Sequence, residues 1–327
     1  MLEKLIQLHQ IKKVFPNTNI PAVDEITFSI EKGNICVFVG PSGCGKTTIL
    51  RMINRLVEPT SGNIFIDGEN VLNVDSDELR RRIGYVIQQI GLLPHRTIEQ
   101  NVGLVPRLLK WPEAKITQRV VELLEIVGLD PAESAKKYPY QLSGGQMQRV
   151  GVARALAADP PIMLMDEPFG AVDPIVRGRL QDEFLRLQQE VKKTICFVTH
   201  DINEAIKMGD YIVVMNGGKL VQQGTPMEVL SNPVNHFVKD LIGDDRGVKL
   251  LDLTRAESLM TAVTESPAAA NDCFCFIDAI QPVKMALEVM MKNDSDMVGI
   301  RRGKNVVGTL SWADIKKHIH KISGDQE

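Results

Sequence analysis

The segment GPSGCGKTT, residues 40–48, constrains the fold of this chain more than any other part of the sequence. It fits the pattern G-x-x-x-x-G-K-S/T, in which a glycine-rich loop joins a buried strand to a helix. The apolar run Ile35–Val39 predicts that strand, and the helix is expected to begin at Lys46. The N–H groups at the start of such a helix carry the positive end of its dipole, which favours a phosphate group. Because many unrelated nucleotide-binding proteins share this loop, it predicts a bound nucleotide but no particular reaction.

Two further segments narrow the class of protein. One is LSGGQ, residues 142–146, a glycine-containing turn that is expected to open a helix. The other is IMLMDEP, residues 162–168, an apolar strand that ends in two acidic residues. Together with residues 40–48, these segments resemble the ATP-binding subunit of an ABC transporter. They also disfavour the alternative that the first loop is a strand-to-helix turn without a ligand.

The loop and its flanks are expected to hold the phosphates of ATP together with Mg²⁺. Lys46 would neutralise the β- and γ-phosphates, and the hydroxyl of Thr47 would ligate Mg²⁺. Cys44 lies where a helix start favours a thiolate, so it is either a redox switch or a small side chain that fits the loop. The residues expected to contact the nucleotide here are Gly40, Ser42, Gly43, Cys44, Gly45, Lys46, Thr47 and Thr48.

Four polar residues are the candidates for the chemistry, and the first three of them follow apolar strands. Asp166 is expected to anchor Mg²⁺, and Glu167 to act as general base on the attacking water, unless the two acids only cap a helix. His200 matches the switch histidine implied by the resemblance, and the alternative is a structural histidine. Gln88, with Gln89 beside it, takes the place of the glutamine that senses Mg²⁺ and the water in ABC ATPases.

The LSGGQ segment is expected to complete the ATP site of a second copy of the chain. In the ABC family this segment lies far from the phosphate loop of its own subunit. The resemblance therefore implies a homodimer with two shared ATP sites. It also implies that Asp173 contacts the other subunit and that the ring of Phe15 stacks on adenine. The alternative for Phe15 is a phenylalanine of the hydrophobic core. The segment's residues in these sites would be Ser143, Gly144, Gly145 and Gln146.

Composition indicates where such a chain works. A formal net charge of -3 disfavours a partner made of nucleic acid. The longest apolar runs are only strand-sized, so a soluble chain is expected, and the membrane permease would be a separate polypeptide. Five cysteines without C-x-x-C spacing suggest neither a disulfide framework nor a zinc site. We therefore expect a peripheral protein on the cytoplasmic face of a bacterial membrane, beside permease subunits and a substrate-binding protein or domain.

The distribution of segments predicts two domains. Residues 1–242 alternate strands and helices, as in the α/β sheet domain of a P-loop NTPase, with a helical insertion at about 90–157. A hinge is expected at 243–247, and residues 243–327 would form a small α+β domain. Its last part is expected to contain helix 282–291, strand 297–301, strand 306–311 and helix 312–319.

The C-terminal order of elements resembles a CBS motif. In that family a Ser or Thr followed three residues later by Asp can hold a ribose, and Ser311 with Asp314 has this spacing. The alternative is an ordinary cap on the last helix. Residues 251–280 give no first copy, so either that copy has eroded or two chains contribute one motif each. A regulatory nucleotide or an anionic lipid is expected here, because basic residues gather at Arg301, Arg302, Lys304, Lys316, Lys317 and Lys321.

The whole pattern resembles the ATP-binding subunits that energise uptake of quaternary amines, such as glycine betaine, carnitine, choline or ergothioneine. One alternative keeps the importer but changes the cargo to amino acids or other small organic solutes. A second is a soluble ABC protein of translation or DNA repair. A third is a nucleotide-binding regulatory module with little turnover, which the intact Lys46, Glu167 and His200 disfavour.

Overall fold

The computed structural model describes residues 3–16, 18–87, 91–170, 172–262 and 275–323. The chain separates into two compact units, Met1–Thr225 and Pro226–Glu327. The first has the predicted α/β fold with a helical insertion, and the second combines helices with a small sheet, so the predicted fold class is confirmed. The predicted domain division after residue 242 stays a prediction. Helices α10 and α11, which end at or before that residue, belong to the second compact unit.

A six-stranded sheet of order β10-β9-β3-β8-β7-β6 forms the centre of the first unit. All pairs are parallel except β10 with β9. Every residue of β3, β7 and β8 is buried, as expected for parallel strands covered on both faces. The strands are β3 (Ile35–Val39), β6 (Ile83–Val86), β7 (Ile162–Asp166), β8 (Thr194–Thr199), β9 (Tyr211–Asn216) and β10 (Lys219–Gly224). Helices α1 (Lys46–Ile53), α2 (Ser76–Arg81), α8 (Pro174–Val191) and α9 (Ile202–Met208) complete this part.

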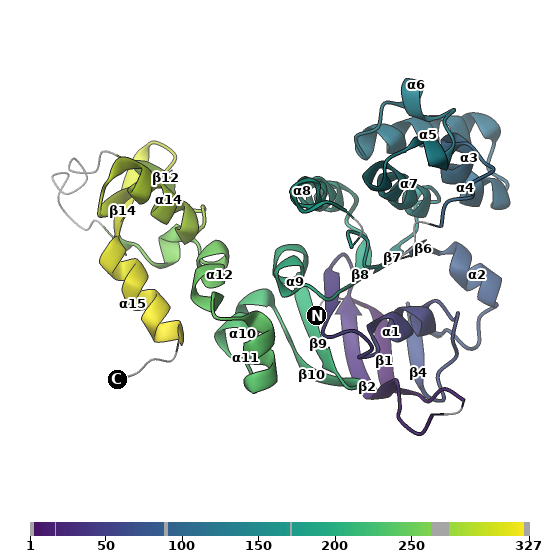
Figure 1. Cartoon of the computed structure of the whole chain (residues 1–327), viewed down its shortest axis with the longest axis horizontal. Helices are drawn as coiled ribbons and strands as arrows, with labels where there is room; N and C mark the ends of the chain where they lie inside the picture. The colour runs from purple at the N-terminus through teal and green to yellow at the C-terminus, as the bar shows by residue number, and fades with distance from the viewer. Residues whose placement is uncertain (1–2, 17, 88–90, 171, 263–274, 324–327) are drawn as a thin grey trace. The chain divides into compact units, whose positions relative to one another are not determined.

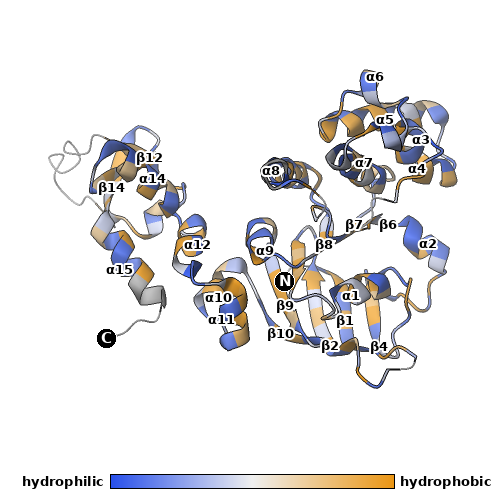
Figure 2. Cartoon of the chain, viewed as in Figure 1, coloured by the Kyte–Doolittle hydropathy of each residue, from blue (hydrophilic) through white to orange (hydrophobic). Residues whose placement is uncertain are grey.

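An antiparallel sheet of order β2-β1-β4-β5 is a second layer that the sequence analysis did not predict. Its buried side chains share one hydrophobic core with α1 and the six-stranded sheet. In Figure 2 the strand β9 carries mostly hydrophobic colours, whereas α2 is hydrophilic. The strands are β1 (Lys4–Lys13), β2 (Val23–Glu31), β4 (Ser61–Ile66) and β5 (Glu69–Asn70).

The helical insertion gathers α3 to α7 into one cluster (Figure 1). The buried side chains of α5 are Ile116, Val120, Leu123 and Leu124, which repeat every three to four residues along one helix face. Between β6 and β7 the insertion contains α3 (Ile98–Val102), α4 (Leu104–Leu108), α5 (Glu113–Ile126), α6 (Pro131–Ser134), the 3-10 turn η1 (Pro139–Gln141) and α7 (Gly144–Leu156).

The second unit has a four-stranded sheet of order β11-β14-β13-β12, in which β12 is parallel to β13. Its hydrophobic core contains residues of α12, β12, α14, β13, β14 and α15. The expected hinge at 243–247 is wrong in part, because α12 begins at Arg246, whose side chain binds the Ser231 carbonyl at the end of α10. The elements are α10 (Pro226–Ser231), α11 (His236–Ile242), α12 (Arg246–Leu253), η2 (Ala256–Ser258), β11 (Thr261–Ala262), β12 (Phe276–Asp278), α14 (Val283–Asn293), β13 (Met297–Arg302), β14 (Asn305–Ser311) and α15 (Trp312–Ser323).

Candidate functional site

The phosphate loop leaves the fully buried strand β3 and enters α1 at Lys46, as the sequence predicts. Gly45 has a φ of 104°, and a Cβ there would lie 2.3 Å from the Ala22 carbonyl oxygen. At Gly40 a Cβ would lie 2.1 Å from the Met215 carbonyl oxygen. Both glycines are therefore required by packing within the chain. No side chain of the described residues caps α1, so its first N–H groups are available to an anion.

The ammonium of Lys46 is held by its own loop. Its Nζ donates to the carbonyl oxygens of Gly40 at 2.7 Å and Pro41 at 2.9 Å, and it lies 3.7 Å from Cys44 Sγ. Lys46 is only 5% exposed and Cys44 only 3%. These contacts place a positive charge beside the N-terminus of α1, and a buried thiol is consistent with the interpretation of Cys44 as a small side chain that fits.

Thr47 and Asp166 meet where α1 begins and β7 ends. The hydroxyl of Thr47 donates to Asp166 Oδ1 at 2.8 Å. Burial raises the pKa of Asp166, while the hydrogen bond from Thr47 acts in the opposite direction. The structure thus brings together two predicted metal ligands that are 119 residues apart in the sequence. Their two oxygen atoms suit Mg²⁺, which binds proteins through few side chains and keeps other positions for phosphate or water.

Glu167 and His200 lie side by side at the ends of β7 and β8. Glu167 has a φ of 47°, an uncommon conformation for a residue other than glycine, and its N–H donates to the Val198 carbonyl. Its Oε1 is 3.3 Å from Nδ1 of His200, whose side chain is 58% exposed. This pair presents a carboxylate and an imidazole next to Asp166. The arrangement suits general-base chemistry on a water molecule.

The LSGGQ segment forms the start of α7. Ser143 Oγ accepts from the N–H of Gln146, and Gln146 Oε1 accepts from the N–H of Ser143, which makes a reciprocal capping box. A Cβ at Gly144 or at Gly145 would meet no atom of the described residues within 4 Å. Packing within the chain therefore gives no steric reason for these two glycines. Small residues here leave room for a group from outside the chain.

The remaining predicted residues lie around this site or beyond the described part. Ser42 is exposed and Thr48 is half-buried on α1. Phe15 is 39% exposed, with the Lys13 ammonium 5.2 Å from its ring centre, so it is not a core phenylalanine. Asp173 is exposed just before α8. Gln88 falls outside the described residues, so its predicted role stays a prediction.

In the C-terminal unit, Ser311 and Asp314 make a second capping box. Asp314 Oδ2 accepts from the N–H and the hydroxyl of Ser311, at 3.0 and 2.6 Å, and the N–H of Asp314 donates to Ser311 Oγ. The cap explains the spacing of the two residues. A ribose, a regulatory nucleotide or an anionic lipid at this unit stays a prediction. Among the neighbouring basic residues, Arg301 stacks on Phe276 and Arg302 pairs with Glu257.

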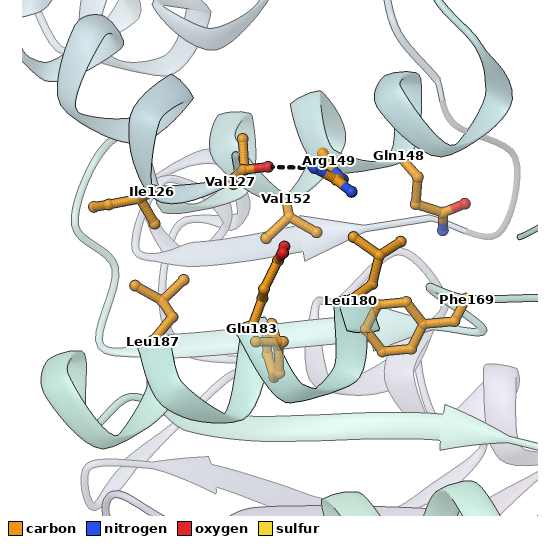
Figure 3. Close-up of a pocket in the computed structure, with 10 residues that line it drawn as sticks. Ile126, Val127, Gln148, Arg149, Val152, Phe169, Leu180, Glu183 and Leu187 are labelled. Carbon is orange, nitrogen blue, oxygen red and sulfur yellow. Dashed lines mark hydrogen bonds between the residues drawn. The ribbon is translucent and has the colours of Figure 1, made fainter. Parts of the chain in front are cut away.

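A small apolar pocket of about 40 Å³ lies in the first unit, between α5 and α7 on one side and α8 on the other (Figure 3). Phe169, Leu180 and Leu187 line its floor, and Arg149 and Glu183 are its charged residues. None of the predicted nucleotide residues lines it. Among the described residues, no cluster of three or more His, Cys, Asp or Glu suits a metal ion.

Known proteins share this fold and sequence. A family described as ABC transporter matches residues 23–170. The chain is 56% identical over 265 residues to the glycine betaine/carnitine/choline transport ATP-binding protein OpuCA of Bacillus subtilis, a match that covers 80% of this chain and 69% of that protein. It is 45% identical over 335 residues to the osmoprotectant import ATP-binding protein OsmV of Salmonella typhimurium, covering 99% of this chain and 86% of that one.

A solved structure gives the same fold. It is a dimeric ATP-binding cassette in a post-hydrolysis state with ADP and Pi, 35% identical, with a TM-score of 0.62 over 68% of this chain and 99% of that one. The fold and the site thus define an ABC transporter ATPase, which binds ATP and couples its hydrolysis to transport. The chain belongs to the ATP-binding subunits of ABC importers, in the family that includes the glycine betaine, carnitine and choline transport proteins. The predicted resemblance to these subunits is confirmed, and the CBS motif of the C-terminal unit stays a prediction. In the described part of the chain, every helix is too short or too polar to cross a membrane.

Proposed function

We propose that this chain hydrolyses Mg²⁺–ATP in two sites shared with a second copy, and so powers import of a quaternary amine such as glycine betaine, carnitine or choline. The observation that carries the ATPase part is the meeting of Lys46, Thr47, Asp166 and Glu167 at one edge of the sheet. The relatives named for these solutes support the cargo class. Ergothioneine, amino acids and other small organic solutes are the alternatives.

Each protein group has a separate task in this proposal. The N–H groups of α1 and the Lys46 ammonium would hold the phosphates, and Thr47 with Asp166 would hold Mg²⁺, which withdraws charge from the phosphate oxygens. Glu167 would accept a proton from water as the water oxygen bonds to the γ-phosphorus and the bond to the ADP oxygen breaks. His200 would orient that water or the γ-phosphate.

The second half of each site would come from the partner copy. The uncapped start of α1 supplies donors on one side of ATP. On the other, Ser143 and the open surface over Gly144 and Gly145 can approach the γ-phosphate of a second copy. Two complete half-sites in one chain favour a homodimer. In a cell this dimer would sit on the cytoplasmic face of a bacterial membrane, beside permease subunits and a substrate-binding protein or domain.

Uptake of radiolabelled glycine betaine, carnitine, choline and ergothioneine tests the proposal in cells that contain wild type or Glu167→Gln and no redundant importer. Glu190→Gln is the matched control, because Glu190 is an exposed glutamate on α8. If Glu167→Gln loses uptake of one solute and Glu190→Gln does not, the result would support the cargo class and name the cargo. Unchanged uptake of all four by an expressed variant would reject the class.

A further inference from the structure

The C-terminal end of α7 is packed closely against β6, the edge strand of the six-stranded sheet. A Cβ at Gly84 of β6 would lie 2.6 Å from the Ala155 carbonyl oxygen and 3.0 Å from Pro160 Cγ. Only glycine fits this approach without displacement of the helix. The helix that carries Ser143 at its start is therefore fixed to the sheet at its far end.

A second contact comes from Arg154, also in the last turn of α7. Its Nη1 donates to the Gly91 carbonyl oxygen at 2.7 Å. Burial lowers the pKa of this guanidinium, and within the described residues no carboxylate lies within ion-pairing distance of it. The Gly91 carbonyl is thus its polar partner, and hydrogen bonds to charged groups are stronger than those between neutral groups.

The segment that follows Gly91 is itself held firmly. Asn101 of α3 is fully buried, and its amide binds this segment at both ends. Its Oδ1 accepts from the Leu93 N–H at 2.7 Å, and its Nδ2 donates to the carbonyl oxygens of Leu93, Arg96 and Thr97 at 3.0 to 3.1 Å. Gly91 has a φ of 56°, which favours glycine. The chain is therefore bound to α3 shortly after the residue that Arg154 contacts.

These contacts connect the strand beside Asp166 with the helix that carries Ser143. In the sheet, Val86 of β6 lies opposite Met165 of β7, directly before Asp166. Helix α7 has 13 residues and is roughly 20 Å long, with Arg154 near its end and Ser143 at its start. A small tilt of the helix about Arg154 therefore displaces Ser143 more than it displaces residues near Arg154. A helix fixed at one end can place its other end accurately only if that anchor holds.

We propose that Arg154 is a positioning residue: by binding the Gly91 carbonyl it sets the orientation of α7 and so places Ser143 and Gly145 against the nucleotide of the second copy. The inference rests on the proposed shared sites. It predicts that Arg154 matters for pairing of two copies around ATP and not for binding of nucleotide to the chain's own loop.

Arg149 provides a matched control on the same helix. Its Nη1 donates to the carbonyl oxygens of Val127 and Gly128, at the end of α5, and Figure 3 shows the bond to Val127. Arg149→Met therefore also removes an arginine from two carbonyls, but these belong to a segment away from Gly91. A general weakening of α7 would affect both variants alike.

The test uses the full chain with Glu167→Gln, which is expected to trap ATP. Dimerisation on addition of Mg²⁺–ATP is measured by light scattering, and binding to the loop by the fluorescent analogue TNP-ATP. We expect Arg154→Met to weaken dimerisation at least about tenfold and Arg149→Met about twofold or less, with TNP-ATP affinity unchanged in both. Arg154→Lys, which keeps a donor, should lie between Arg154→Met and the parent.

Two results would overturn the inference: dimerisation of Arg154→Met at the parental affinity, or an equal loss in Arg149→Met. If Arg154→Met fails to fold and binds no TNP-ATP, Arg154→Lys is compared with Arg149→Lys instead. Equal dimerisation affinities of these two lysine variants would reject the positioning role. A parent that binds TNP-ATP but never dimerises would remove the proposed shared sites, and the inference with them. Failure of the proposed function is thus seen in the parent, and failure of the inference in the variants.

Discussion

The starts of α1 and α7 are both glycine-rich, yet the glycines serve different purposes. At α1, Gly40 and Gly45 avoid overlap with carbonyls of the same chain, and the helix start is left without a side-chain cap. At α7, Gly144 and Gly145 face open space, and Ser143 and Gln146 cap the helix. The first start is a site built from its own chain. The second helix start is capped by its own side chains, and its glycines leave room for another molecule.

The largest expected effect concerns the acid that completes the α1 site. Asp166→Asn should lower ATP turnover at least about a hundredfold, because it removes a charged Mg²⁺ ligand. Phosphate release measures the loss, and Asp182→Asn, at an exposed position on α8, is the control.

The same variant should be more stable than wild type at neutral pH. Burial raises the pKa of Asp166 above its unfolded value, so the ionised form destabilises the folded chain once the pH exceeds the unfolded value of about 4. The gain should vanish as the pH falls well below that value, because the carboxyl is then protonated in both the folded and the unfolded state. Urea unfolding at several pH values measures it, and a pH-independent difference would contradict the prediction.

The next effect is on stability at the start of α1. Gly45→Ala should lower the free energy of unfolding by about 2–4 kcal/mol, because the new methyl group overlaps the Ala22 carbonyl at a positive φ. Gly43→Ala is the control, since φ there is also positive but no atom in the described part of the chain lies within 4 Å of the Cβ. It should cost only about 1 kcal/mol. Equal losses would mean that backbone conformation, not overlap, requires Gly45.

Gly145→Ala tests the opposite character of α7. It should raise the free energy of unfolding by up to about 1 kcal/mol, because alanine favours a helix and the space is free. ATP-driven dimerisation should nevertheless weaken at least about tenfold, since the methyl group lies where the second copy approaches. Dimerisation at the parental affinity would show that the open surface over Gly145 is not a contact.

The smallest effect belongs to the capping box of the second unit. Ser311→Ala should lower the free energy of unfolding by about 1 kcal/mol through loss of the α15 cap, with ATP turnover of the isolated chain unchanged. Thermal unfolding and phosphate release give the two readouts. A change in turnover would point to a regulatory role for Ser311 beyond the cap.

Sequence patterns predicted most residues of the proposed ATP site because each of them follows a local signal. Asp166, Glu167 and His200 come directly after apolar strands, and the phosphate loop has fixed spacing. The β1–β2–β4 sheet was missed because three register shifts interrupt the pairing of β1 with β2 and obscure its alternation. Arg154 and Asn101 gave no signal, since a side chain bound to a distant carbonyl leaves no periodic pattern in the sequence.

By itself, the sequence determined the class of the protein, the strand-loop-helix around Lys46 and the helices and strands within residues 282–319, since these depend on spacing and hydrophobic period within short segments. Only the tertiary structure decided that Thr47 touches Asp166, that Gly40 and Gly45 are required by the carbonyls of Met215 and Ala22, and that Arg154 binds Gly91. These contacts join segments far apart in the chain. Their geometry follows from how the two sheets and the helices pack, which no local pattern specifies.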